Sequence, residues 1–271
     1  EVWGNSKSKS LESIHLKFCK TLLRVKRSTP SMAVYGDLGR YPLYINRYVR
    51  IIGYWLKLVN TDNILLEKMY SLLLTDNKQG HKNWVTGVKQ LLDEYGFGYV
   101  WLNPLSVNQN NFCKVFKRRV IDCFMQKWHD EVYNCGVLCS YRHFKNAFEY
   151  ETYLDVLPFN LVHFISKLRL SSHPLRIETG RYGRARVDRN ERHCIFCNES
   201  DLEDGYHFIC VCPAYNDIRK IYIGKQFYSH PSFFKFCDLM KSVKKTELVN
   251  LSKYIKEGFQ IRISLVNNDA N

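Results

Sequence analysis

The chain has 271 residues, of which 45% are hydrophobic and 24% are charged, a composition typical of a globular protein with a substantial core. It contains no apolar run of about eighteen residues, which argues against a membrane span, and no secretory signal, so we expect an intracellular protein, in the nucleus or cytoplasm, that is not secreted. Forty Lys and Arg against 26 Asp and Glu give a net charge of +14, for which nucleic acid is the natural partner.

Apolar residues spaced by three and four positions dominate the first 95 residues, as in amphipathic helices. Pro30, Pro42, Asp62 and Asn83 mark further helix starts, because such residues favour the beginning of a helix. Gly96 is expected to end the fifth helix. Short helices in series predict a packed bundle. The first helix is expected to begin at Ser10 and to carry an apolar stripe formed by Leu11, Ile14, Phe18, Leu22 and Val25.

The helical pattern is interrupted at residues 96–104, and we interpret the run 99–102 as an extended connector. A longer helix is expected from Asn108 and another over about residues 140–150. Between them lies a group of metal-binding residue types. Because Gly136 interrupts this group and no tight ligand turn is present, we interpret its thiols as buried or surface groups and not as a second metal site. The group consists of His129, Cys135, Cys139 and His143.

A helix expected from Leu161 leads into a basic segment. Residues 167–192 contain eight Lys or Arg, all but one of them Arg, against three acidic residues. The planar guanidinium of arginine suits phosphate oxygens and base edges, and Tyr182 could stack on an unpaired base or, alternatively, anchor the loop in the core. The predicted nucleic-acid-binding residues are Lys167, Arg169, Arg176, Arg181, Tyr182, Arg184, Arg186, Arg189 and Arg192.

The basic segment runs directly into a metal-type motif. Cys194 and Cys197 form a Cys-x-x-Cys turn, His207 follows after a polar loop, and a third Cys would close a tetrahedral shell typical of structural Zn2+. Cys210 would share a helical face with His207, whereas Cys212 can be a ligand only if the helix ends before it, as the following proline favours. The spacing therefore predicts a structural zinc site; the alternative is a set of unpaired buried thiols.

Three more helices are expected after the motif, over residues 215–222, 232–240 and 246–261. The expected fold class is mainly α, with a helical bundle followed by a small Cys-Cys-His-Cys zinc-knuckle region and its flanking helices. We expect one region over residues 1–157 and a second, with the basic segment and the knuckle, over residues 158–271.

Several of these motifs together resemble a known family. The run LRLSSHPLRIETGRY at 168–182, the Cys turn after Arg192, and the pairs Glu203-Asp204, His207-Phe208 and Cys212-Pro213 resemble the region downstream of the polymerase in invertebrate non-LTR (LINE-type) retrotransposon reverse transcriptases. The family form His-x4-Cys favours Cys212 over Cys210 as the fourth ligand. Val-Trp-Gly at 2–4 and the segment 14–42 resemble the stretch that follows the polymerase, so the resemblance covers most of the chain.

The resemblance implies a nucleic-acid-handling C-terminal region that holds RNA or single-stranded DNA beside the remainder of the reverse transcriptase polypeptide. The chain begins with Glu1 and not with Met, so we expect a piece of a longer protein. The family polymerase needs adjacent aspartates and the family nuclease needs a Pro-Asp motif; the sequence contains neither, so we expect no enzyme activity. The alternatives are an interaction scaffold that docks on the polymerase and a zinc-stapled nuclease that uses His173 and His193.

Overall fold

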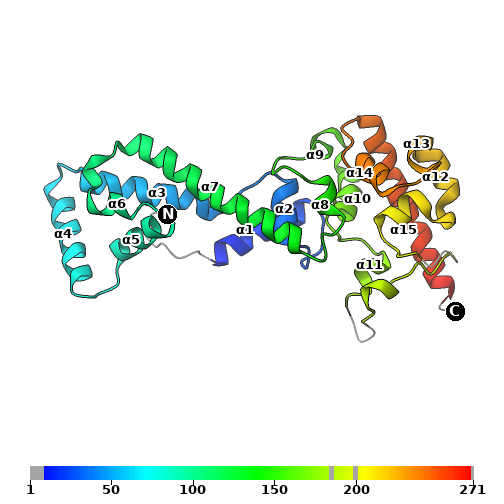
Figure 1. Ribbon diagram of the computed structural model, residues 1–271, viewed down its shortest axis with the longest axis horizontal. Coiled ribbons are helices and arrows are strands. Elements are labelled where there is room, and N and C mark those ends of the chain that lie inside the picture. The colour runs from blue at the N-terminus through cyan, green and yellow to red at the C-terminus, as the bar shows by residue number, and fades with distance from the viewer. Residues whose placement is uncertain (1–8, 183–185, 198–200, 270–271) are drawn as a thin grey trace. The chain divides into compact units, whose positions relative to one another are not determined.

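The computed structural model describes residues 9–182, 186–197 and 201–269 (Figure 1). These residues are mainly helical and contain no strand; isolated antiparallel bridges join Leu38 with Tyr150 and His193 with Leu202. The prediction of a mainly α fold class is therefore confirmed. No helix within these ranges combines the length and the apolar character that a bilayer span requires.

Fifteen α-helices and four short helical turns make up the described part of the chain. The α-helices are α1 (Lys9–Leu22), α2 (Ser31–Asp37), α3 (Leu43–Val59), α4 (Ile64–Lys78), α5 (Trp84–Glu94), α6 (Gly98–Leu102), α7 (Gln109–Asn134), α8 (Tyr141–Phe144), α9 (Tyr153–Val156), α10 (Phe159–Arg169), α11 (Arg176–Thr179), α12 (Asn216–Tyr222), α13 (Lys225–Tyr228), α14 (Phe233–Met240) and α15 (Lys245–Asp269). The short turns are η1 (Pro104–Ser106), η2 (Arg189–Glu191), η3 (His207–Val211) and η4 (Pro213–Tyr215).

The chain divides into two compact units that differ from the two regions expected from the sequence. The first unit holds Tyr41–His129 with the residues up to His15. The second unit holds Leu16–Arg40 with the residues from Asp130 onward. The residues between 16 and 40 thus join the C-terminal half of the sequence.

Hydrogen bonds over long sequence separations hold the second unit together. The backbone N–H of Lys26 donates to the Ser172 hydroxyl at 2.8 Å. The carboxylate of Asp37, on α2, accepts hydrogen bonds from Arg169 on α10 and from the hydroxyl of Tyr141 on α8. These buried contacts explain why residues 16–40 pack with elements that follow them by more than a hundred positions.

Side-chain caps fix the starts of α4 and α5 in the first unit. The Asn83 side chain accepts hydrogen bonds from the backbone N–H groups of Val85 and Thr86, and the Thr86 hydroxyl accepts one from the Asn83 N–H, so α5 begins where the sequence predicts. The cap of α4 is Asn63 and not Asp62. Helix α3 packs against both α4 and α5 (Figure 1).

Three expectations from the sequence differ from the structure. The run 99–102, interpreted as extended, lies in α6, whose Trp101 ring stacks on Trp55 of α3 at 5.5 Å between ring centroids. The helix expected over 140–150 is reduced to α8. The first helix forms as expected, but its buried side chains are His15 and Cys19. The expected apolar stripe, Leu11, Ile14, Phe18 and Leu22, is 45–66% exposed.

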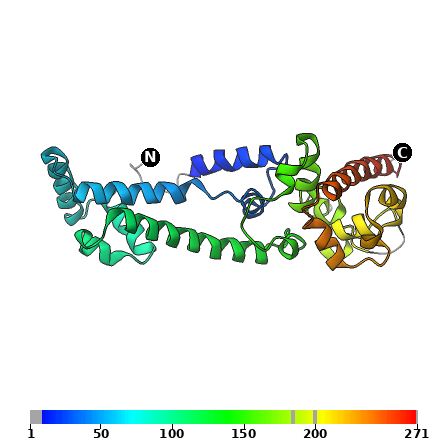
Figure 2. The same cartoon turned by 90° about the horizontal axis from the view of Figure 1, so that it is seen from above.

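The long helix α15 is the red helix near the C-terminus in Figure 2. It packs against α10 and α12, and its buried residues include Tyr254 and Phe259. The Phe259 ring stacks on that of Phe208, which belongs to η3, at 5.4 Å between centroids. Helix α15 therefore supports the segment that carries the metal-type motif.

Candidate metal centre and adjoining basic segment

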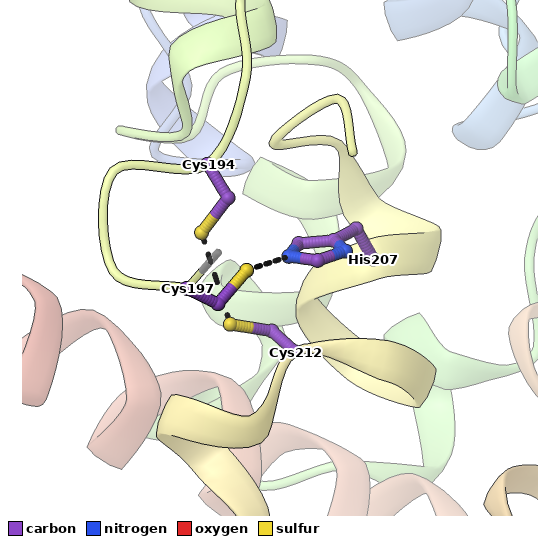
Figure 3. Close-up of side chains that lie close together, drawn as sticks. All are labelled: Cys194, Cys197, His207 and Cys212. Carbon is purple, nitrogen blue, oxygen red and sulfur yellow. Dashed lines mark hydrogen bonds between the residues drawn. The ribbon is translucent and has the colours of Figure 1, made fainter. Parts of the chain in front are cut away.

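Four side chains of the metal-type motif point toward one another (Figure 3). The ligand atoms of Cys194, Cys197, His207 and Cys212 all lie within 4.8 Å of one another. The sulfurs of Cys194 and Cys212 are 3.8 Å apart, and the sulfur of Cys197 is 3.4 Å from Nε2 of His207. This group could hold a metal ion, and among the residues that the structure describes it is the one group found with that capacity.

A short antiparallel hairpin presents the first two thiols. The backbone N–H of Cys194 donates to the carbonyl of Asp201 at 2.8 Å, and the N–H of Glu203 donates to the carbonyl of Arg192 at 2.9 Å. His193 and Leu202 form the bridge between these two bonds. The Cys-x-x-Cys turn is thus held at its base by backbone pairing.

A π-helical turn presents the other two ligands. The N–H of Cys212 donates to the carbonyl of His207, five residues earlier, at 2.8 Å. Because a π-turn has more residues per turn than an α-helix, it brings the fifth residue closer to the side on which the first lies. At Cys212 the backbone becomes extended, with φ −52° and ψ 121°, before Pro213. The π-turn therefore ends at Val211, and the side chain of Cys212 joins the ligand group.

Cys210 lies outside the ligand group. Its side chain is 2% exposed, and burial raises the pKa of its thiol to about 12. The sequence predicts Cys212 as the last ligand, with Cys210 as the alternative. The π-turn places Cys212 in the group, as the resemblance favours.

Side chains of α12 and α15 donate hydrogen bonds to backbone carbonyls of the π-turn and of Cys212. The buried guanidinium of Arg219, on α12, donates to the carbonyl of Ile209 at 2.7 Å and to that of Cys212 at 2.6 Å. The hydroxyl of Tyr254 donates to the carbonyl of Phe208. Carbonyls at a helix end need such partners when they are buried, so α12 and α15 stabilise the irregular turn.

The environment of His207 orients its ring. The imidazole Nε2 faces the sulfurs, while Nδ1 lies 3.4 Å from a carboxylate oxygen of Asp201. Burial lowers the pKa of His207, but the hydrogen bond and charge of Cys194, together with the charge of Asp201, raise it more, so the net pKa shift is upward. A carboxylate behind a ligating histidine is a common arrangement in metal sites, where it fixes the ring orientation.

Glu203 ties the ligand hairpin to two other elements. Its carboxylate, which is buried, accepts hydrogen bonds from the Nε and Nη2 of Arg262 on α15, and from the backbone N–H of Arg176 at the start of α11. Its carbonyl accepts from the N–H of Ile177 at 3.1 Å. The hairpin and the start of α11, within the basic segment, are therefore fixed to each other through one residue. No sequence pattern indicates the supporting roles of Asp201, Arg219 and Arg262, and Glu203 is marked only by the resemblance.

The basic segment is divided between buried, half-buried and exposed side chains. Tyr182 is 53% exposed, and Arg186 and Arg189 are exposed as well. Lys167 and Arg176 are half-buried, and Arg184 lies outside the described residues. Arg181 is half-buried and donates to Glu178 at 2.9 Å and to the carbonyl of Gly136.

Two of the predicted nucleic-acid contacts have structural roles instead. The guanidinium of Arg169 is bonded to Asp37 and to the carbonyl of Met240, and only 2% of the residue is exposed. Arg192 is 5% exposed and donates to the carbonyls of Val187 and Ile177. Neither side chain offers a surface to a ligand, because both are buried with their donors directed to protein oxygens. We therefore leave both out of the proposed interface.

Within the described ranges, the second group of metal-binding residue types, His129, Cys135, Cys139 and His143, forms no site that could hold a metal ion. The sulfur of Cys139 donates to the carbonyl of Gly136, and the ring of His143 packs edge-on against Phe233. Of the two histidines considered for a nuclease, His173 is buried and His193 is exposed.

Comparisons of the chain with protein-family models, curated proteins and solved structures give no match.

Proposed function

We propose that the four-residue group is a structural zinc knuckle. The observation that supports zinc is the spacing of the ligand atoms. Two thiolates bound to Zn2+ at about 2.3 Å in a tetrahedron lie about 3.8 Å apart, which equals the 3.8 Å between Cys194 and Cys212. Three sulfurs and one nitrogen are a ligand set that zinc prefers, and four protein ligands would close the shell. The proposed role of the metal is therefore to hold the hairpin and the π-turn together.

We further propose that the chain is the C-terminal, nucleic-acid-binding portion of a non-LTR retrotransposon reverse transcriptase protein, which acts by binding and not by catalysis. Exposed Arg186 and Arg189 lie just before the knuckle, and exposed Tyr182 precedes them. Cationic donors and an exposed aromatic ring suit an unpaired strand, since arginine binds its phosphates and the ring can stack on a base. The proposed ligand is RNA or single-stranded DNA, and the proposed protein partner is the rest of the reverse transcriptase.

The test of this interface is a titration of a labelled single-stranded oligonucleotide at several salt concentrations. Removing two phosphate contacts in Arg186→Ala/Arg189→Ala should make the dependence of log K on log salt shallower by about 1.4. The matched control is Lys253→Ala/Lys256→Ala, which removes the same charge from exposed positions on α15. If the arginine variant retains the parent affinity at every salt concentration, the interface proposal is wrong and a protein-interaction scaffold replaces it.

Variants of Tyr182 distinguish base stacking from the contribution of charge to binding. If its ring stacks on a base, Tyr182→Ala should weaken binding by about 1–3 kcal/mol with little change in the salt slope. Tyr182→Phe keeps the ring and should bind like the parent. Equal binding by the Ala variant would exclude stacking at this position.

A further inference from the structure

Helix α7 is labelled in Figure 1, and its residues 109–129 belong to the first unit. This part of the helix carries an exposed basic cluster that is separate from the knuckle and from the basic segment. Lys114, Lys117, Arg118 and Arg119 fall within six positions, and all four are exposed. No acidic residue occurs in α7 before Asp122. The first three turns of this helix therefore present only positive charge.

Three of these residues share one face of α7. Lys114, Lys117 and Arg118 have i, i+3 and i+4 spacing, which places their side chains next to one another on a helix surface. They extend over about 6 Å of the helix axis, at about 1.5 Å per residue. Arg119 is the next residue after Arg118 and points away from this face, because successive residues differ by about 100° around a helix. We call Lys114, Lys117 and Arg118 the α7 basic face.

The opposite side of α7 is fixed in the core of the first unit. Phe112 and Phe116 are 5% and 0% exposed, and the ring of Phe116 packs edge-on against that of Tyr95 at 5.6 Å between centroids. Phe112 and Phe116 also contact the ring of Phe97. Because these aromatic contacts hold the helix, the basic face is a preorganised surface on a rigid element.

The positive charge of the α7 basic face is not compensated. Among the residues described, none of its three side chains forms an ion pair or a side-chain hydrogen bond. Like charges at i and i+4 destabilise a helix by a few tenths of a kilocalorie per mole. Asp122 lies four positions after Arg118, but no ion pair or hydrogen bond joins these two side chains in the described structure. An uncompensated cluster of this kind suits a polyanion.

We propose that the α7 basic face is a second contact surface for nucleic acid, which binds backbone phosphates without reading bases. Lysine and arginine on a rigid helix neutralise successive phosphates, and no aromatic side chain is among the three. An anionic membrane is the less suitable partner, because a helix that binds a lipid surface also inserts an apolar face, and the apolar face of α7 is buried in its own unit. The α7 basic face and the basic segment have no residue in common, and the proposed ligand of both is nucleic acid.

The experiment compares full-length variants in binding to a fluorescein-labelled 40-nucleotide single strand across a salt series. Lys114→Ala/Lys117→Ala/Arg118→Ala should shallow the salt slope by about 2, with a roughly ten- to hundredfold loss of affinity at 0.1 M salt. Alanine is a strong helix former and the positions are exposed, so circular dichroism should match the parent. The matched control, Lys68→Ala/Lys78→Ala/Lys82→Ala, removes the same charge from exposed positions elsewhere in the first unit and should change the slope by less than about 0.5.

The outcomes separate this inference from the proposed function. A shallower slope in the α7 variant together with no effect of Arg186→Ala/Arg189→Ala would support the α7 surface and overturn the basic segment. The reverse pattern would overturn the α7 surface alone. Equal effects of the α7 variant and its lysine control would also overturn it, because the loss would then follow from net charge and not from this face. Binding of phosphatidylserine vesicles by the parent, abolished in the α7 variant while oligonucleotide binding persists, would assign the face to a membrane and overturn the proposal.

Discussion

The guanidinium of Arg262 and the carboxylate of Glu203 form a bidentate ion pair, with Nε–Oε1 at 2.6 Å and Nη2–Oε2 at 2.8 Å. The pair joins α15 to the hairpin that carries two of the four ligands, and Glu203 is 1% exposed. The Arg262 guanidinium also lies over the ring of Phe196, inside the Cys-x-x-Cys turn, at 5.5 Å from the centroid. One contact thus couples the C-terminal helix to the proposed knuckle.

Breaking this pair should destabilise the second unit. Glu203→Ala leaves a buried guanidinium without its partner, which typically costs about 3–5 kcal/mol in the free energy of unfolding. Urea denaturation at saturating zinc measures this cost. Adding Arg262→Ala to the Glu203→Ala variant should cost about 1 kcal/mol or less, because the stranded charge is then removed. Additive losses in the double variant would mean that the two side chains act independently.

The ligand assignment predicts opposite results for neighbouring cysteines. Cys197→Ser and Cys212→Ser should each lose bound zinc and the structure of the knuckle, because metal binding is part of the folding of such sites. Cys210→Ala should retain one zinc per chain and lose only about 1–3 kcal/mol for a truncated buried side chain. Elemental analysis of purified protein and a chelator titration measure these outcomes. Zinc loss from the Cys210 variant with retention in the Cys212 variant would reverse the assignment.

The buried imidazole of His173 should make the free energy of unfolding fall in mild acid. Burial lowers the pKa of His173 to about 3, with nearby Lys26, Arg262 and Arg181 acting in the same direction. Its folded-state pKa lies below the ordinary value of about 6.5, so between pH 6.5 and pH 3 the unfolded chain binds a proton that the folded chain does not. The free energy of unfolding must therefore fall as the pH falls through this window.

The contribution of His173 can be isolated by comparing two proteins. Between pH 7 and pH 5.5 it should remove about 1 kcal/mol from the parent, and His173→Gln should show a correspondingly smaller decline. Other titrating groups, including the proposed zinc ligands, act equally on both proteins and cancel in the difference. Urea denaturation at the two pH values measures it. If the free energy of unfolding declines equally in the two proteins, His173 binds a proton as readily in the folded chain as in the unfolded chain, and its pKa is not lowered.

Local chemistry allowed the sequence to predict most helix starts and the ligand set. Asn83 caps α5 and Ser232 caps α14 because their short polar side chains bond N–H groups two or three residues away, wherever the rest of the chain lies. The same holds for Cys194, Cys197 and His207, whose spacing is that of a known ligand pattern. Pro213 and the resemblance favour Cys212 in the sequence, but the sequence does not indicate the π-turn that brings Cys212 beside His207. Carbonyls of this turn accept hydrogen bonds from Arg219 and Tyr254 of later helices.

Tertiary structure alone decided which side chains are buried. The periodicity of the first helix predicts an apolar stripe but not whether a neighbour covers it, and the structure buries His15 and Cys19 instead. Arg169 looks like the other arginines of its segment, yet its partner, Asp37, is 132 residues away. A pattern within one segment carries no information about such a distant carboxylate. The sequence therefore determined the local elements and the ligand types, while long-range packing determined which charges remain free to bind.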